Sequence, residues 1–156
     1  MNKFIFLIFS FLVAACNANE SFIEPLKTEF ETISFEVVQK QLILEKELPN
    51  HVQNLLSQWF DQRVKIDGFE GNMKFIVSDF NQEITSIKEG KRVDVSLSFE
   101  VILNKSSLSQ IKRIEGNISS YGTLTGNFSL SEFDTVIQNT QSDLILRLSK
   151  DLKSKI

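Results

Sequence analysis

The stretch 93–103 alternates hydrophobic and polar residues without a break, and this pattern constrains the fold more than any other part of the sequence. The hydrophobic positions are Val93, Val95, Leu97, Phe99, Val101 and Leu103. Successive side chains of a strand point to opposite faces, so the pattern predicts a strand with one buried and one solvated face. Such strands occur in antiparallel sheets that are packed on one face only.

Weaker alternation predicts further strands on both sides of this one. Residues 32–38 form the first, and the apolar cluster 42–44 either extends it or leads into a helix. Residues 73–80 form another strand with both faces partly apolar. Residues 111–125 form a weaker strand that we expect to be bulged, because glycines interrupt it. Turns rich in polar residues or glycine separate the strands at 68–71, 88–91 and 104–109.

Two segments have helical periodicity. Pro49 is suited to a first helical turn, and the apolar residues after it recur with the spacing of one helix face. These residues are Val52, Leu55, Leu56, Trp59 and Phe60. The second helix covers 130–156, where Ser129 and Glu132 form a capping box flanked by Phe128 and Phe133 at staple positions. A kink or break is expected at 139–141, since Asn and Thr are poor helix-interior residues.

The order strand, helix, three strands, helix predicts an α+β fold. We expect a two-layer sandwich, in which a mostly antiparallel four-stranded sheet carries both helices on one face. The phenylalanines of the predicted domain lie at strand or helix periods, which favours the core, with a lipid-binding groove as the alternative.

The first fifteen residues have the composition of an export signal. Lys3 precedes an apolar run, 4–15, that only Ser10 interrupts, and small residues stand before Cys16. The twelve residues of the run are fewer than the roughly 20 that a membrane-spanning helix needs. A cleaved signal is therefore expected rather than a permanent anchor, and a plain secretory signal fits the length equally well.

The sequence Val13-Ala14-Ala15-Cys16 resembles the lipobox of bacterial lipoproteins. The resemblance implies that the chain is cut before Cys16 and that acyl chains on this residue hold the protein to a membrane, since two or three chains anchor stably. The sequence then divides into a signal (1–15), a lipidated cysteine with its tether (16–31) and one domain (32–156). Phe22, Ile23 and Phe30 are the tether residues that could instead pack on the domain.

The order of elements, with a lipobox, a tether, a strand, a proline-led helix bearing a tryptophan, a meander and a final helix, is similar to that of envelope lipoproteins. These include the lipopolysaccharide-assembly lipoprotein and the auxiliary lipoproteins of phospholipid transport. The run 71–79 resembles that of uncharacterised alphaproteobacterial lipoproteins. The resemblance implies an accessory role in envelope assembly or lipid transport, with an envelope protein, a lipid or lipopolysaccharide as partner. Asn17, where an aspartate would resemble an inner-membrane retention signal, implies an outer-membrane protein that faces the periplasm.

The residues suited to catalysis are few. His51 is the only histidine and is expected to be solvated at a helix start, and zinc cannot be held by one histidine and one lipidated cysteine. Four carboxylates near turns could pair for acid–base chemistry but are more typical of solvated surfaces. They are Asp79, Glu83, Glu89 and Asp94.

The sequence therefore predicts a protein that is not an enzyme and has no metal or cofactor. Its net charge of −3, without a basic run, excludes nucleic acid as a partner. The alternatives are a tethered periplasmic enzyme that uses Asp79 or Glu83 and a purely structural envelope protein.

Overall fold

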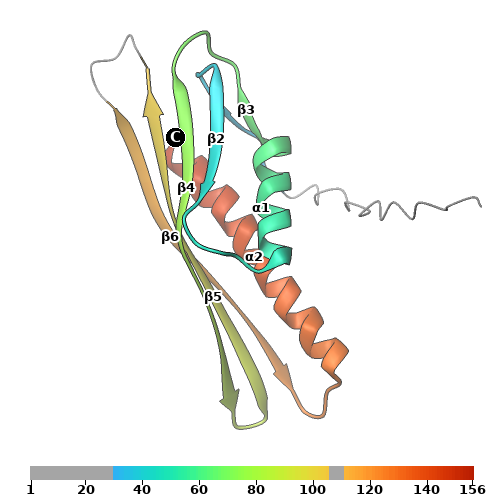
Figure 1. The fold of residues 1–156 in the computed structure, drawn as a ribbon. Coiled ribbons are helices and arrows are strands. Elements are labelled where there is room, and N and C mark those ends of the chain that lie inside the picture. The colour runs from blue at the N-terminus through green and yellow to red at the C-terminus, as the bar shows by residue number, and fades with distance from the viewer. Residues whose placement is uncertain (1–29, 106–110) are drawn as a thin grey trace, which may run out of the picture.

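The computed structural model describes residues 30–105 and 111–156 of the chain (Figure 1). It contains two helices and six strands in these ranges. In chain order they are β1 (Ile33–Phe35), β2 (Gln39–Leu44), α1 (Asn50–Arg63), β3 (Val64–Ile66), β4 (Asn72–Ile87), β5 (Gly90–Asn104), β6 (Lys112–Thr125) and α2 (Leu130–Lys155).

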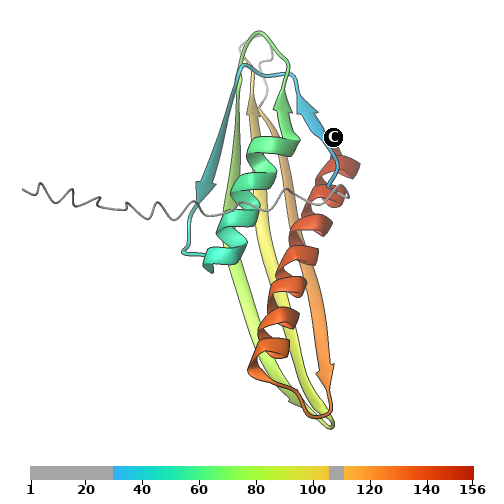
Figure 2. The same cartoon turned by 90° about the vertical axis from the view of Figure 1, so that its right-hand side faces the viewer.

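The main sheet has four strands in the order β2-β4-β5-β6, and a two-stranded sheet pairs β1 with β3. β2 runs parallel to β4, whereas the pairs β4–β5 and β5–β6 are antiparallel. Both helices lie on the same face of the main sheet, as the rotated view shows (Figure 2). The predicted α+β two-layer sandwich is confirmed.

The core lies between β5 and its neighbours on one side and the helices on the other. The alternating residues Val93, Val95, Leu97, Phe99 and Val101 are all buried, which confirms the strand. Three aromatic rings occupy the centre of the core. The Phe75 ring stacks on Phe99 at 5.5 Å with an interplanar angle of 6° and meets Trp59 edge-on at 5.5 Å. The described phenylalanines are thus mainly core residues, and Phe69 is the clear exception.

The predicted strand 32–38 is not one element. Ile33, Phe35 and Val37 are buried as their alternation requires, but the chain turns where the Val37 amide donates to the Phe35 carbonyl at 2.8 Å. β1 then pairs with β3, a strand that directly follows α1 and that the sequence analysis did not predict. The place beside β4 in the main sheet belongs to β2, which contains the cluster 42–44.

The bulge lies in β4, between Val77 and Asp79, and not in the segment 111–125 where it was expected. Before the bulge, Met73, Phe75 and Val77 face the helices; after it, the residue parity changes, so that Phe80 lies opposite the buried Leu97. This shift explains the even parity of Phe80, whereas Ile76 precedes the bulge and lies on the opposite face of the sheet.

β6 keeps a regular register with β5 from Lys112 to Thr125, and its glycines serve packing instead. A Cβ atom on Gly122 would lie 2.3 Å from Thr140 Oγ1 and 3.0 Å from Val136 Cγ1. α2 can therefore lie close to β6 only because this position has no side chain.

The predicted capping box is present at the start of α2. The Glu132 amide donates to Ser129 Oγ at 3.2 Å, and the Ser129 amide donates to Glu132 Oε2 at 2.7 Å. The expected break at 139–141 is absent from this helix, which runs continuously from Leu130 to Lys155. Thr140 and Gln141 are buried there, and Gln141 Nε2 donates to Gln82 Oε1 of β4 at 2.7 Å. These contacts with the sheet outweigh the weak helix propensity of the segment.

Two residues of the predicted tether contact the domain. Phe30 is 4% exposed and belongs to the core, and Glu31 forms an ion pair with Lys153 of α2. Of the three tether residues that could pack on the domain, Phe30 does so, whereas Phe22 and Ile23 lie outside the described residues. Neither helix in the described part of the chain is long and apolar enough to cross a membrane.

Candidate functional site

The residue with the most specific sequence signal, Cys16, lies outside the described residues, as do the signal 1–15 and Asn17. Acylation of Cys16 therefore stays a prediction. The candidate site within the described ranges is the sheet face opposite the helices, which we call the open face. It is formed by the outward-pointing residues of β2, β4, β5 and β6.

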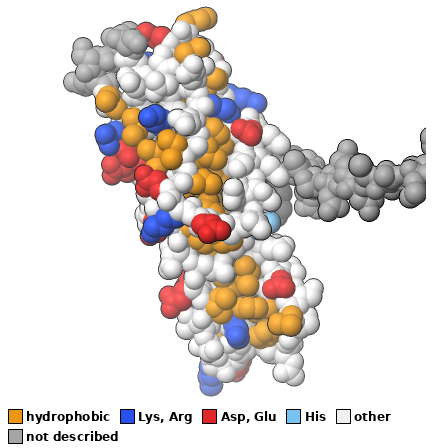
Figure 3. Space-filling model, in the orientation of Figure 1, with side chains coloured by type: hydrophobic (Ala, Val, Ile, Leu, Met, Phe, Trp, Pro, Cys, Tyr) orange, Lys and Arg blue, Asp and Glu red, His pale blue; other side chains and the backbone are white. Residues whose placement is uncertain are grey.

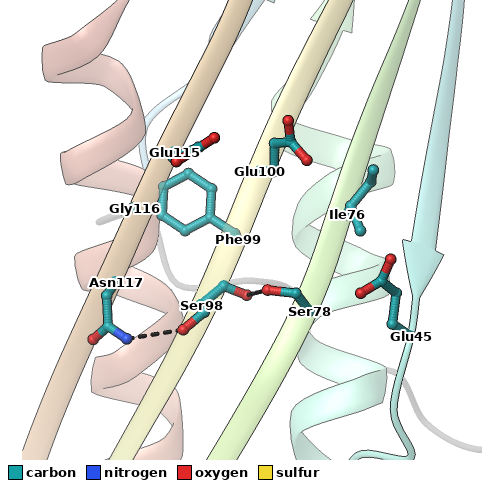
Figure 4. Close-up of a pocket in the computed structure, with 9 residues that line it drawn as sticks. All are labelled: Glu45, Ile76, Ser78, Ser98, Phe99, Glu100, Glu115, Gly116 and Asn117. Atoms are coloured by element: carbon teal, nitrogen blue, oxygen red, sulfur yellow. Dashed lines mark hydrogen bonds between the residues drawn. The ribbon is translucent and has the colours of Figure 1, made fainter.

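A hollow of about 480 Å³ lies on the open face and is shallow and open to solvent (Figure 4). Its polar lining comes mainly from the strands β4, β5 and β6. The lining residues are Glu45, Ile76, Ser78, Ser98, Phe99, Glu100, Glu115, Gly116 and Asn117. Asn117 Nδ2 donates to Ser98 Oγ at 2.8 Å, and Ser78 Oγ donates to the Ser98 carbonyl at 3.4 Å. These bonds link the three strands across the floor of the hollow.

Two neighbouring glutamates line the hollow. Glu100 and Glu115 are register partners on β5 and β6, so their side chains stand side by side on the open face. Arg113 Nη1 donates to Glu100 Oε1 at 2.7 Å and compensates one of the two charges. Glu45, which follows β2, adds a third carboxylate to the rim. The hollow is therefore acidic and polar.

An apolar stripe runs beside the hollow, formed by Ile43, Ile76 and Ile102, which are only partly buried. Ile43 and Ile76 are register partners on β2 and β4, and Ile102 stands diagonally across from Ile76 on β5. Figure 3 shows hydrophobic side chains gathered over these strands in the upper half of the molecule. Isoleucines bordered by charged residues, on a face that neither described helix covers, form a surface suited to contact with another molecule.

The carboxylates named from the sequence do not converge. Asp79 and Glu83 stand four residues apart on β4, which corresponds to about 13 Å along a strand. Lys46 Nζ donates to Asp79 Oδ1, and this hydrogen bond lowers the pKa of the Asp79 carboxyl. Glu89 lies in the turn between β4 and β5, at the far end of the sheet.

Glu83 and Asp94 are register partners and form the one close pair among these four residues. Arg92 donates to both Asp94 oxygens, from Nε at 2.8 Å and 2.9 Å and from Nη2 at 2.7 Å. The hydrogen bonds from Arg92 lower the pKa of the Asp94 carboxyl. The Arg92 guanidinium also lies 4.5 Å from the centroid of the Tyr121 ring. A general acid at neutral pH needs a raised pKa, so the perturbation at Asp94 runs in the opposite direction.

His51 was expected to be solvated. It instead forms a contact between the two helices. Its Nε2 atom lies 3.2 Å from Ser142 Oγ of α2, and this hydroxyl donates to the Gln138 carbonyl at 2.9 Å. Ser142 lies inside a helix, where no strand-to-helix turn exposes it as a nucleophile.

Among residues 30–105 and 111–156, no three His, Cys, Asp or Glu side chains are grouped as metal ligands.

The Glu100–Glu115 pair was not predicted from the sequence. Both residues occupy outward positions of predicted strands, and that was the available signal. Their juxtaposition depends on the register of β5 with β6. The sequence of the connection between these two strands does not define that register.

No protein-family model and no curated protein sequence matches the chain. Among solved structures it is similar to a minor lipoprotein from Acinetobacter baumannii, with a TM-score of 0.43 and 10% identity over 77% of this chain and 92% of the other. A hypothetical protein from Chlamydia trachomatis has a TM-score of 0.42 and 6% identity over 76% of this chain and 96% of the other. A provisionally assigned lipoprotein from Caulobacter crescentus has a TM-score of 0.40 and 8% identity over 72% of this chain and 84% of the other. Likenesses this distant carry no argument about the function of this chain.

Proposed function

We propose that this protein is an outer-membrane lipoprotein, anchored through acylated Cys16, that assists envelope assembly or lipid transport by binding a partner and not by catalysis. The observation that carries the proposal is the open face, where an apolar stripe lies beside an acidic hollow. The anchoring itself rests on the sequence Val13-Ala14-Ala15-Cys16.

The open face supports binding because its hydrophobic and charged residues are arranged as in contact surfaces. Partly exposed isoleucines can be removed from water by a partner, which contributes about 25 cal/mol per Å² of apolar surface. The surrounding charges, which include Lys74 and Arg113 as well as the glutamates, set the orientation of that partner rather than adding much affinity.

The rival function, a tethered acid–base enzyme, has weaker support. Asp79 and Glu83 are too far apart to act on one bond as a pair, since paired glycosidase carboxylates lie within about 5–9.5 Å. Among residues 30–105 and 111–156, five carboxyl groups have a pKa that departs from its ordinary value, and in each the pKa is lowered, mostly by hydrogen bonds from neighbouring groups. A purely structural protein, which only fills space beside a partner, would use the same open face. Contact through this face is therefore common to the structural role and to the proposed accessory role.

Photocrosslinking in cells tests the proposal directly. A photoreactive amino acid is placed at Ile76 on the open face and, as a matched control, at Gln53 on the exposed side of α1. We expect crosslinks to an envelope protein or to lipid from position 76 and none from position 53. Equal products from both positions, or none from position 76, would contradict binding through this face.

The placement in the outer membrane has its own test. After density-gradient separation of the two membranes, we expect the protein with outer-membrane markers, and Asn17→Asp should move it toward the inner-membrane fractions. Wild-type protein in the inner-membrane fractions would refute the outer-membrane assignment without affecting the proposal of an acyl anchor.

A further inference from the structure

The loop between β3 and β4 presents a phenylalanine to solvent. We call residues 67–71 the tip loop. Phe69 is fully exposed at its centre, and two other hydrophobic residues next to the loop, Val38 and Ile66, are 48% and 38% exposed. Figure 3 shows hydrophobic side chains at the top of the molecule, where Figure 1 places this loop. A whole aromatic side chain in water forgoes the favourable free energy of its burial, and exposed apolar clusters mark contact sites for proteins or membranes.

The tip loop has a fixed conformation. The Asp67 amide donates to the Phe35 carbonyl at 3.1 Å, the Gly68 amide to the Val37 carbonyl at 3.2 Å, and the Val38 amide to the Gly71 carbonyl at 3.3 Å. Gly71 has a φ of +80°, which favours glycine. A Cβ on Gly68 would lie only 2.3 Å from the carbonyl carbon of Glu36. The two glycines and the three hydrogen bonds therefore hold Phe69 outward.

The chain enters the domain near this end. Phe30 is only five residues from Phe35, whose carbonyl binds the tip loop, and five extended residues span at most about 18 Å. The opposite end of the molecule, where Leu130 is 82% exposed, is farther away. The tether joins the domain beside Ser149 of α2, because the Glu31 carbonyl accepts from Ser149 Oγ at 3.5 Å. Leu130 lies nineteen positions earlier in the same helix, which corresponds to about 28 Å along the helix axis.

The length of chain between Cys16 and Phe30 is compatible with contact between the tip loop and the membrane. If the fourteen residues from Cys16 to Phe30 behaved as a flexible coil, their end-to-end distance would be about 20 Å, which is similar to the greatest distance from Phe30 to Phe35. An acyl group on Cys16 would thus let the tip loop reach the bilayer surface, and the start of α2 lies farther from the point where the tether joins the domain.

We infer that the tip loop docks on the phospholipid bilayer that carries the acyl anchor and inserts Phe69 at the boundary of headgroups and acyl chains. Phenylalanine is among the residues that interfacial segments bury there. The contact would orient the long axis of the domain away from the membrane and leave the open face accessible to a partner. This inference rests on the proposed anchoring through Cys16.

The test uses full-length lipidated protein in vesicles of phosphatidylethanolamine and phosphatidylglycerol with brominated acyl chains, which quench nearby tryptophans. Phe69→Trp places a reporter in the tip loop, and Leu130→Trp places the matched control at the opposite end. The native Trp59 is fully buried in the core and gives a constant background in both variants. Mass spectrometry of the N-terminal peptide measures acylation, and circular dichroism verifies folding.

We expect the added emission of Phe69→Trp to fall at least twofold in brominated vesicles and that of Leu130→Trp to stay unchanged. Acylated protein with equal quenching at both positions, or with none at position 69, would overturn the docking of the tip loop and leave the anchor intact. A Cys16 peptide without acyl groups would overturn the proposed anchoring and this inference together.

Discussion

Replacing Gly116 with alanine should destabilise the domain, although alanine is ordinarily the better residue in a strand. The Cβ atom would lie 2.4 Å and 2.5 Å from Cε1 and Cζ of Phe99, about 1 Å closer than ordinary van der Waals contact. The Phe99 ring cannot easily retreat, because it is buried and stacked on the buried Phe75 ring. Overpacking of this kind costs about 1–3 kcal/mol.

The gain from removing a glycine offsets part of this cost. Gly116 has no positive φ, so alanine fits the backbone and contributes about 0.5–1 kcal/mol of strand preference. The net expectation is a loss of about 1–2 kcal/mol in the free energy of unfolding, which for a domain of this size corresponds to a fall in Tm of about 3–10 °C.

Urea unfolding followed by the fluorescence of Trp59 measures this change, because the indole packs directly against Phe75. Ser119→Ala, on an exposed outward position of β6, is the control and should shift stability by less than about 0.5 kcal/mol. In the double variant Gly116→Ala/Phe99→Leu the smaller side chain makes room, so the combined loss should be smaller than the sum of the single losses. Stability equal to or above wild type for Gly116→Ala, or strict additivity, would refute the packing argument.

Three other predictions concern the anchor, a helix end and pH. Wild-type protein should take up radioactive palmitate in cells, whereas Cys16→Ser should not; unlabelled wild type would return the chain to the plain secreted class. Lys40 Nζ donates to the carbonyls of Phe60 at 2.7 Å and Val64 at 2.6 Å, at the end of α1. Lys40→Met should therefore lower the free energy of unfolding in urea by about 1.5–3 kcal/mol. An equal loss for the exposed Lys74→Met would contradict this role. The hydrogen bond from the Ser129 amide lowers the pKa of Glu132, so its charge stabilises the fold above the ordinary glutamate pKa of about 4.3 and this contribution is lost as pH falls through the lowered pKa. In thermal unfolding, the difference between wild type and Glu132→Gln should therefore shrink on acidification, and a difference that grows would show the opposite sign.

The features that could be predicted from the sequence are those that one segment specifies by itself. The strict alternation of 93–103, the helical spacing that follows Pro49 and the capping box at Ser129 each define an element without reference to the rest of the chain. Their combination gave the correct fold class, because a strand with one apolar face needs a covering layer.

The features that could not be predicted depend on pairing between distant segments. β3 has only three residues and exists because β1 lies beside it, and the bulge in β4 is visible only against the register of β5. The helix continues through Thr140 because Gly122 and Gln82 of the sheet meet it there. The Glu100–Glu115 pair on the open face likewise follows from register, which no local pattern defines.

The bulge in β4 has a consequence for comparing this chain with its relatives. The extra residue changes which positions face the core in the middle of a central strand, so odd-numbered positions are under packing constraint before Ser78 and even-numbered ones after it. A homologue that lacks the bulge would match this sequence only with a one-residue gap inside the strand. Alignment methods that confine gaps to loops would then misplace half of β4 by one position and pair core residues with surface residues.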